Sequence, residues 1–246
     1  RNAGNLTYRL LDHEVNQIKD QFSKDRAWHD LGVQAINLAG SHFITTGSGK
    51  YFRNVELDPE HSSGIVELND KGDAWRLLWG LEAGGKPTSE FPSHIFNHSV
   101  RLDVTQGKNR VIYHAHTPSL IAMTFILPLN SKAFTKALWK SATECIVVFP
   151  DGVGVVPWMV PGGSDIATST SQEMKHHQAV VWAHHGLFCS GESFDEAFGL
   201  MHTIEKSAEI YMKVISSGKD ILQVITDEDL LAIADDFDVD INKEYF

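Results

Sequence analysis

Two histidines stand two residues apart in this chain, directly after an apolar run. His114 and His116 follow Val111-Ile112-Tyr113, which has the composition of a buried strand. A strand rises about 3.3 Å per residue and sends residues i and i+2 to the same face, so both imidazoles, about 7 Å apart, could reach one ion. The pattern therefore predicts a strand that ends at a metal site, although with 13 histidines in the chain some close pairs arise by chance.

A third ligand is predicted after a second strand-like run, Ala179 to Trp182. His185 follows this run and precedes Gly186, a residue that lets the backbone turn sharply or approach another segment closely. Three neutral imidazoles suit Zn²⁺ and leave a coordination position open for a substrate. His184 is an alternative ligand, because it is adjacent to His185. In a continuing strand the two side chains would point to opposite faces. Spacing alone does not choose between the two.

The composition is that of a globular protein that can bury a substantial core, with 42% hydrophobic and 22% charged residues. A net charge of -11 without a Lys/Arg-rich run argues against a nucleic-acid partner. The chain has no run of 18 apolar residues and no signal-peptide pattern, so we expect a cytoplasmic protein without a membrane partner. Cys145 and Cys189 are expected to be reduced core thiols. Because the chain begins at Arg1, we expect that an upstream segment is missing.

Hydrophobic periodicity and turn residues predict strands and helices without a regular alternation. Strands are expected at 5–10, 42–45, 65–68, 75–79, 110–116, 145–149 and 179–183. Helices are expected at 90–102, 119–127, 131–142, 164–177, 193–217 and 226–237. Ser193 with Glu196, and Thr226 with Asp229, are predicted to cap the last two helices. Short turns such as 69–72 favour antiparallel hairpins, and no repeat or linker interrupts the chain, so residues 1–246 are predicted to form one layered α/β domain.

Three polar turns carry groups that could bind an anion. The segment 1–5 offers two amide side chains and a glycine N–H, and 45–50 is a Gly/Ser loop whose N–H groups and hydroxyls can surround a phosphate. The turn 87–90 opens a predicted helix, whose unpaired N–H groups and dipole favour an anion. Each could equally be an ordinary turn or helix cap.

Two carboxylates have candidate roles. Glu90 lies in the first turn of a predicted helix, where a carboxylate ordinarily complements the helix dipole. Beside a metal ion it could instead take a proton from a substrate carbon, with burial raising its pKa and the ion and helix N-terminus lowering it. Glu144 precedes the predicted strand 145–149 and is by default a solvated charge.

These motifs together resemble the class II aldolase/adducin superfamily. The resemblance covers nearly the whole chain and rests on residues 111–116, 184–186, 46–50 and 87–90. Within the superfamily, residues 1–10, 46–54 and 138–162 closely resemble the bacterial family that acts on L-rhamnulose 1-phosphate, most diagnostically at 141–154 and 157–162. The resemblance implies a three-layer α/β/α sandwich with a central, largely antiparallel sheet. It also implies reversible, zinc-dependent aldol cleavage of L-rhamnulose 1-phosphate to dihydroxyacetone phosphate and L-lactaldehyde.

The resemblance further implies the residues of a zinc centre. His114, His116 and His185 match the ligands of one Zn²⁺ ion per subunit, and Glu90 matches the catalytic acid/base. His184 stands where the family has an aromatic residue, so a modest change around the ligands is expected there.

A phosphate site and a shared active site are also implied. The residues that match the substrate phosphate site are Asn2, Gly4, Asn5, Ser48, Thr88 and Ser89. Glu144 matches a second catalytic carboxylate, which the family places at the active site of the neighbouring subunit, where it helps proton transfer at the aldehyde oxygen. The expected assembly is therefore a homotetramer with active sites between subunits.

Three other functions compete with this expectation. An L-fuculose-1-phosphate aldolase would use the same mechanism with different stereochemistry, and an L-ribulose-5-phosphate 4-epimerase would have Asp where Glu90 stands. The local match through residues 144–162 favours the first reaction over both. An adducin-like scaffold without chemistry has no physical need for an open metal site, which argues against it. The sequence does not set the stereochemistry of the aldehyde, nor exclude another divalent metal.

Overall fold

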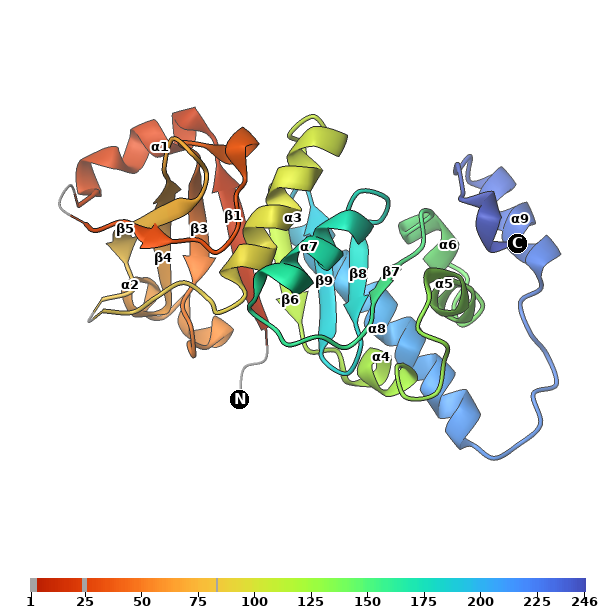
Figure 1. Cartoon of the computed structure of the whole chain (residues 1–246). Helices are drawn as coiled ribbons and strands as arrows, with labels where there is room; N and C mark the ends of the chain where they lie inside the picture. Colours follow the sequence, from red (N-terminus) through yellow and green to blue (C-terminus); the bar gives the residue numbers. More distant parts are fainter. Residues whose placement is uncertain (1–3, 24–25, 83) are drawn as a thin grey trace.

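A nine-stranded sheet runs through residues 4–23, 26–82 and 84–246, which are the residues that this computed structural model describes (Figure 1). The strand order is β2-β5-β4-β3-β1-β6-β9-β8-β7. The strands are β1 (Gly4–Leu10), β2 (His29–Asp30), β3 (His42–Thr46), β4 (Ser63–Leu68), β5 (Ala74–Gly80), β6 (Val111–Ala115), β7 (Gly154–Val156), β8 (Ala179–Trp182) and β9 (Gly186–Gly191). The β7–β8 pair is parallel and the other neighbours are antiparallel, which confirms the predicted sheet.

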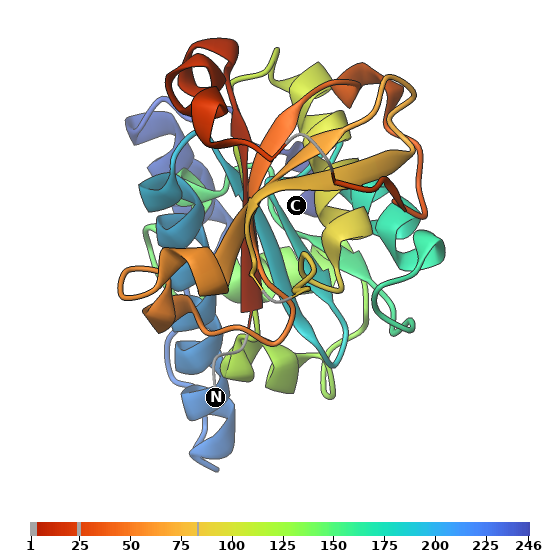
Figure 2. The same cartoon turned by 90° about the vertical axis from the view of Figure 1, so that its left-hand side faces the viewer.

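Helices cover both faces of this sheet, as predicted (Figure 2). One face carries α3 (Phe91–Val104) and α7 (Ser164–Glu173), which pack against each other. The other carries α4 (Pro118–Met123), α5 (Ser131–Trp139), α6 (Cys145–Val148), α8 (Phe194–Ser216) and α9 (Asp227–Asp236). Two short helices, α1 (Asp12–Ile18) and α2 (Pro59–Ser62), lie near the first strands. None of the helices in the described part of the chain combines the length and hydropathy needed to cross a membrane.

Strand β8 is apolar on both faces because each face packs against helices. In β8, Ala179 and Val181 join the core beneath α8, whereas Val180 and Trp182 join the core beneath α7. All four side chains are buried, so the run lacks the alternation of a half-exposed strand. This packing explains why apolar runs, rather than alternating patterns, marked the strands that carry the site.

The predicted strand at 145–149 is wrong: these residues form helix α6, with Phe149 as its C-cap. Ile146, Val147 and Val148 favour strands, but Cys145 and Ile146 are buried in the core where α6 packs against α8 and α9. Tertiary packing therefore overrides the local preference. Glu144 is consequently the N-cap of a helix rather than an entry to a strand. Strands β2, β7 and β9 and helices α1 and α2 were not among the predicted elements.

The predictions made from capping and turn residues at helix ends and hairpins agree with the structure. The Ser193 hydroxyl accepts a hydrogen bond from the Glu196 N–H, and Thr226 with Asp229 forms a capping box, which confirms both predicted caps. The hairpin between β4 and β5 turns at residues 69–72, as predicted. Cys145 and Cys189 are buried free thiols, which also agrees with the prediction.

Candidate active site

Four side chains from different parts of the sequence converge beyond the end of β6. Glu90, His114, His116 and His185 place one ligand atom each within 4.8 Å of one another. The three imidazole rings lie 4.9–5.1 Å apart between centroids. The distances between the ligand atoms approach the separation of roughly 3–4 Å expected between the ligand atoms of one tetrahedral zinc ion. The structure therefore brings together the three predicted metal ligands and the predicted acid/base.

His114 is held with one ring nitrogen aimed into this cluster. Its Nδ1 lies 3.1 Å from the carbonyl oxygen of Leu187, to which an Nδ1–H donates, and its ring stacks on Phe188 at 4.4 Å between centroids. Nε2 is buried and has no hydrogen-bond partner among the described residues. Burial and the nearby His185 and His116 hold the pKa of His114 well below its ordinary value. A neutral imidazole with an unpaired, buried lone pair fits a metal ligand.

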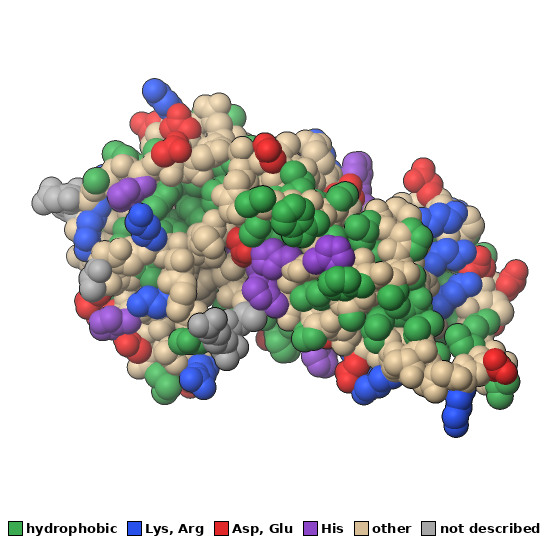
Figure 3. All heavy atoms as spheres, turned by 60° about the horizontal axis from the view of Figure 1, so that its bottom comes forward, with side chains coloured by type: hydrophobic (Ala, Val, Ile, Leu, Met, Phe, Trp, Pro, Cys, Tyr) green, Lys and Arg blue, Asp and Glu red, His purple; other side chains and the backbone are tan. Residues whose placement is uncertain are grey.

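The other two histidines face the open side of the cluster. The side chain of His185 is 22% exposed, and His116 is exposed just past the end of β6. Burial and His116 lower the pKa of His185 to about 4, and burial lowers the pKa of His116. Both rings are therefore neutral near pH 7 and could bind a divalent cation. Figure 3 shows histidine side chains gathered on this face of the molecule between apolar side chains.

His184 and His185 both lie in the tight turn between β8 and β9 but point to different neighbours. His184 adopts the left-handed conformation with φ of 62°, so the strand does not continue through it. Its Nδ1 lies 3.0 Å from the Thr124 hydroxyl, and its ring packs on Phe125 at 4.3 Å. The turn thus directs His184 onto the residues that follow α4 and leaves His185 beside His114 and His116.

Gly186 lets β9 approach the histidine end of β6. A Cβ atom at Gly186 would lie 2.3 Å from the Ala115 carbonyl oxygen and 3.1 Å from the His114 ring, so backbone would have to move. We expect Gly186→Ala to lower the free energy of unfolding by about 1–3 kcal/mol. The matched control is Gly199→Ala within α8, where a Cβ would meet nothing within 4 Å. That change should raise stability by about 0.5–1 kcal/mol, and equal effects of both changes in urea unfolding would contradict the account.

Glu90 is the N-cap of α3 and is only 6% exposed. Its carboxylate oxygens lie 3.3 Å from His185 Nε2 and 3.6 Å from His114 Nε2. The Asn5 amide donates a hydrogen bond of 2.5 Å to Oε2. Burial raises the pKa of Glu90, and the hydrogen bond from Asn5 opposes that rise. The carboxylate is therefore a proton acceptor placed beside two of the three clustered histidines.

A pocket of about 380 Å³ opens beside Glu90 and His116 and collects the predicted phosphate residues. Its lining includes Gly4, Asn5, Ser48, Thr88 and Ser89. The loops 45–50 and 87–90 meet because the Ser48 N–H donates to the Lys86 carbonyl and Gly47 forms an isolated β-bridge with Pro87. Residues 4 and 5 join them because β1 pairs with β3.

Four residues that line this pocket were not among the predicted site residues, and two of them are Gly47 and Gly49 of the Gly/Ser loop. Lys50 and Tyr51 also line it, and Lys50 supplies a positive charge suited to an anion. The signal for Lys50 was its place at the end of the Gly/Ser loop. Asn2 lies outside the described residues.

Glu144 does not join the cluster within the chain. Its carboxylate pairs with Lys206 at 2.9 Å on the surface, and this hydrogen bond lowers the pKa of Glu144. The side chain is 47% exposed, so it is free to face another molecule.

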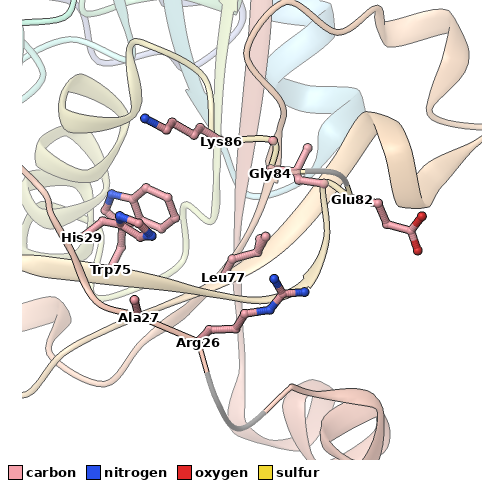
Figure 4. Close-up of a pocket in the computed structure, with 10 residues that line it drawn as sticks. Arg26, Ala27, His29, Trp75, Leu77, Glu82, Gly84 and Lys86 are labelled. Atoms are coloured by element: carbon pink, nitrogen blue, oxygen red, sulfur yellow. The ribbon is translucent and has the colours of Figure 1, made fainter.

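A separate hollow of about 370 Å³ lies against β5 (Figure 4). Its lining includes Arg26, Lys86 and the stacked rings of His29 and Trp75, whose centroids are 4.6 Å apart. It contains none of the predicted site residues. The hollow is therefore distinct from the candidate active site.

A carboxylate beside three neutral imidazoles, open to a phosphate-type pocket, is the arrangement expected of a metal-dependent enzyme acting on a phosphorylated substrate. The chain belongs to the class II aldolase and adducin family, because the family model "Class II Aldolase and Adducin N-terminal domain" matches residues 2–212. It is an enzyme of the class II aldolase type, a carbon–carbon lyase. Aldolases of this class depend on a metal ion, for which the four-residue cluster offers ligands.

Sequence relatives narrow the reaction. A rhamnulose-1-phosphate aldolase from Mannheimia succiniciproducens is 48% identical over 93% of this chain and 84% of its own length. One from Escherichia fergusonii is 47% identical over 97% of this chain and 87% of its own length. These relatives support aldol cleavage of a phosphorylated sugar.

Solved structures share the fold. The sugar-phosphate aldolase from Thermotoga maritima has a TM-score of 0.73 and 25% identity, over 89% of this chain and 88% of its own. An L-fuculose 1-phosphate aldolase has a TM-score of 0.57 and 21% identity, over 96% of this chain and 86% of its own, and shows the fold alone.

Proposed function

We propose that this enzyme cleaves L-rhamnulose 1-phosphate reversibly to dihydroxyacetone phosphate and L-lactaldehyde, with one Zn²⁺ ion per subunit. The observation that carries the proposal is the position of Glu90. Its carboxylate contacts two of the three clustered histidines and also lines the phosphate-type pocket. A proton acceptor is thus next to both the expected ion and the expected anchor of the substrate.

The histidines would hold the ion through their neutral ring nitrogens. His114 Nε2 is the strongest support, because it is buried without a partner among the described residues while Nδ1 is fixed by the Leu187 carbonyl. When bound, Zn²⁺ would act as a Lewis acid that polarises the substrate carbonyl and stabilises negative charge on the neighbouring oxygens. The side of the cluster formed by His116 and His185 is open to solvent, so a substrate could reach the ion from that side.

The pocket residues would orient the substrate through its phosphate. The hydroxyls of Ser48, Thr88 and Ser89 and the Ser89 N–H can donate hydrogen bonds to phosphate oxygens, and Lys50 adds a positive charge. The phosphate does not react, but its binding fixes the reacting carbons near Glu90.

Glu90 would move the proton at the carbon that leaves as part of dihydroxyacetone phosphate. In cleavage, the C4 hydroxyl gives its proton to the Glu144 carboxylate of the neighbouring subunit, the C3–C4 electron pair passes to the C2–C3 unit, and the aldehyde departs. The Glu90 carboxyl, protonated at the start of cleavage, then donates its proton to C3 and completes dihydroxyacetone phosphate. The proton on Glu144 is exchanged through solvent for the one that Glu90 has given up, so no proton is gained or lost overall. In the condensation direction the Glu90 carboxylate removes that same proton.

The substrate is tested by comparing three sugar phosphates with the zinc-loaded enzyme. We expect release of dihydroxyacetone phosphate fastest from L-rhamnulose 1-phosphate and more slowly from L-fuculose 1-phosphate. L-ribulose 5-phosphate should give no epimer. If L-ribulose 5-phosphate alone reacted, giving an epimer without cleavage, the proposed reaction would be wrong although the site would stand.

We also propose that the enzyme is a homotetramer in which Glu144 completes the active site of a neighbouring subunit. Glu144 is exposed and does not belong to the cluster of Glu90 and the three histidines in its own chain. Large apolar side chains exposed on the subunit are candidates for the interface: Phe125, which packs on His184, is 71% exposed, and Trp158 and Val160 are 63% and 71% exposed.

Mixed tetramers test this shared site. His114→Ala and Glu144→Ala subunits should each be inactive alone. After subunit exchange at equal amounts, about one quarter of the sites would combine an intact His114 with a neighbour's intact Glu144. Activity should therefore recover to roughly a quarter of the wild-type value. No recovery in proven hybrid tetramers would overturn the shared site.

A further inference from the structure

The face of α3 that packs into the protein is polar where a helix normally buries apolar side chains. Ser93, His94, Asn97 and His98 are all at most 1% exposed. Burying a polar side chain costs free energy unless hydrogen bonds compensate it. The hydrogen bonds of His94 and His98 lead in one direction, toward Glu90 at the start of the same helix.

A continuous chain of side-chain hydrogen bonds connects these residues. The ring of His98 contacts the Thr7 hydroxyl through Nε2 at 2.9 Å, and the same hydroxyl contacts His94 Nδ1 at 2.9 Å. His94 Nε2 contacts the Asn5 amide oxygen. The amide nitrogen of Asn5 then donates to Glu90 Oε2 at 2.5 Å. Two residues of β1 thus alternate with two histidines of α3.

The chemistry at Glu90 sets the direction of every bond in this chain. A carboxylate only accepts hydrogen bonds, so the amide nitrogen of Asn5 must face it and the amide oxygen must face His94. His94 must then carry its proton on Nε2, and its Nδ1 must accept from the Thr7 hydroxyl. Thr7 in turn accepts from Nε2–H of His98. Burial lowers the pKa of His94 to about 3, in agreement with a neutral ring that has one donor and one acceptor.

We propose that His94 is a positioning residue, which through the Asn5 amide holds the Glu90 carboxylate between His114 and His185. Without the His94 donor, the Asn5 amide could rotate and present its oxygen to the carboxylate. The proposal rests on the proposed acid/base role of Glu90. It also gives Asn5 a second task, because Asn5 both donates to Glu90 and lines the pocket beside it.

Paired substitutions separate positioning from packing. His94→Gln keeps a side-chain N–H within reach of the Asn5 oxygen, whereas His94→Leu keeps an apolar side chain without a donor. We expect His94→Leu to lower kcat by about 10- to 100-fold, as is typical when a group that orients a reacting residue is lost. KM and zinc content should stay close to the wild-type values. His94→Gln should retain most of the wild-type kcat.

Nitrogen NMR of ¹⁵N-histidine-labelled, zinc-loaded enzyme tests the contact without using activity. The His94 signals, assigned by their absence in His94→Gln, should show a protonated Nε2 and an unprotonated Nδ1. A proton on Nδ1 would overturn the proposal, as would equal losses of kcat in the Gln and Leu variants or full kcat in the Leu variant. If His94→Leu does not fold, Thr7→Val, which removes the hydroxyl that orients His94, replaces it with a smaller expected loss.

Comparing the Glu90 and His94 variants distinguishes failure of the positioning role from failure of the proposed function. Full turnover in Glu90→Gln would refute the role of Glu90, whereas the NMR result would still report on the His94 contact. Loss of turnover in Glu90→Gln together with full turnover in His94→Leu would refute only the positioning role.

Discussion

Replacing Glu90 with glutamine is expected to lower kcat by about 10²- to 10⁴-fold, the contribution typical of a general acid or base. Glutamine has nearly the same shape, so the N-cap position of α3 and the fit beside His114 and His185 should survive. It cannot accept or return the substrate proton. Zinc content, measured by atomic absorption, should remain close to one ion per subunit because the three imidazoles are unchanged.

Glu228→Gln is the matched control for this change. Glu228 also lies in the first turn of a helix, α9, but on the surface and away from the cluster. A carboxylate there complements the helix dipole. Removing its charge should lower the free energy of unfolding by at most about 1 kcal/mol. Turnover should be unchanged in this variant. Near-normal turnover in Glu90→Gln would show that Glu90, like Glu228, serves only the helix.

Replacing His185 with alanine is expected to weaken zinc binding by more than about 100-fold. Loss of a residue that only supports a metal ligand costs up to about 100-fold in affinity, and loss of a ligand itself should cost more. Turnover at limiting zinc should fall with it. The physical reason is that two imidazoles and a carboxylate bind the ion less tightly than three imidazoles beside the same carboxylate. Competition with a zinc-sensitive chelating dye measures the affinity directly.

His184→Asn provides the control in the adjacent residue. Asparagine tolerates the left-handed backbone that His184 adopts, so the turn between β8 and β9 should be retained. Because His184 contacts Thr124 and Phe125 rather than the cluster, zinc affinity should change little. A larger loss of affinity in His184→Asn than in His185→Ala would mean that the two histidines have been assigned in the wrong order.

The sequence predicted the parts of this protein that depend on neighbours in the chain. His114 sits on a buried strand because the apolar run before it had the composition of one, and helix α8 begins after Ser193 because a capping residue preceded a helical pattern. Residues of the three polar turns were also named, and the structure brings most of them to one pocket with Glu90.

The parts that failed depend on residues distant in sequence. The Cys145–Phe149 segment has strand composition, and only its packing against α8 and α9 makes it helical. Spacing could not choose between His184 and His185, because the left-handed turn at His184 was not visible in an otherwise strand-like run.

The hydrogen-bond chain to Glu90 also could not be predicted, because it joins residues that are distant in the sequence. Asn5 and His94 are 89 residues apart, and Thr7 and His98 are 91 apart, so the contacts exist only once β1 lies against α3. A signal was nevertheless present in the sequence. Polar residues at 93, 94, 97, 98 and 101 recur with helical spacing along α3, and their burial was the unexpected feature.

The central claim is that the cluster of Glu90 and three histidines makes a metal-dependent carbon–carbon lyase. The most direct measurement is the rate of dihydroxyacetone phosphate release from L-rhamnulose 1-phosphate before and after chelation, and again after adding Zn²⁺ back. We predict that chelation abolishes release and that one equivalent of Zn²⁺ per subunit restores it. Undiminished release by protein shown to contain no metal would contradict the account.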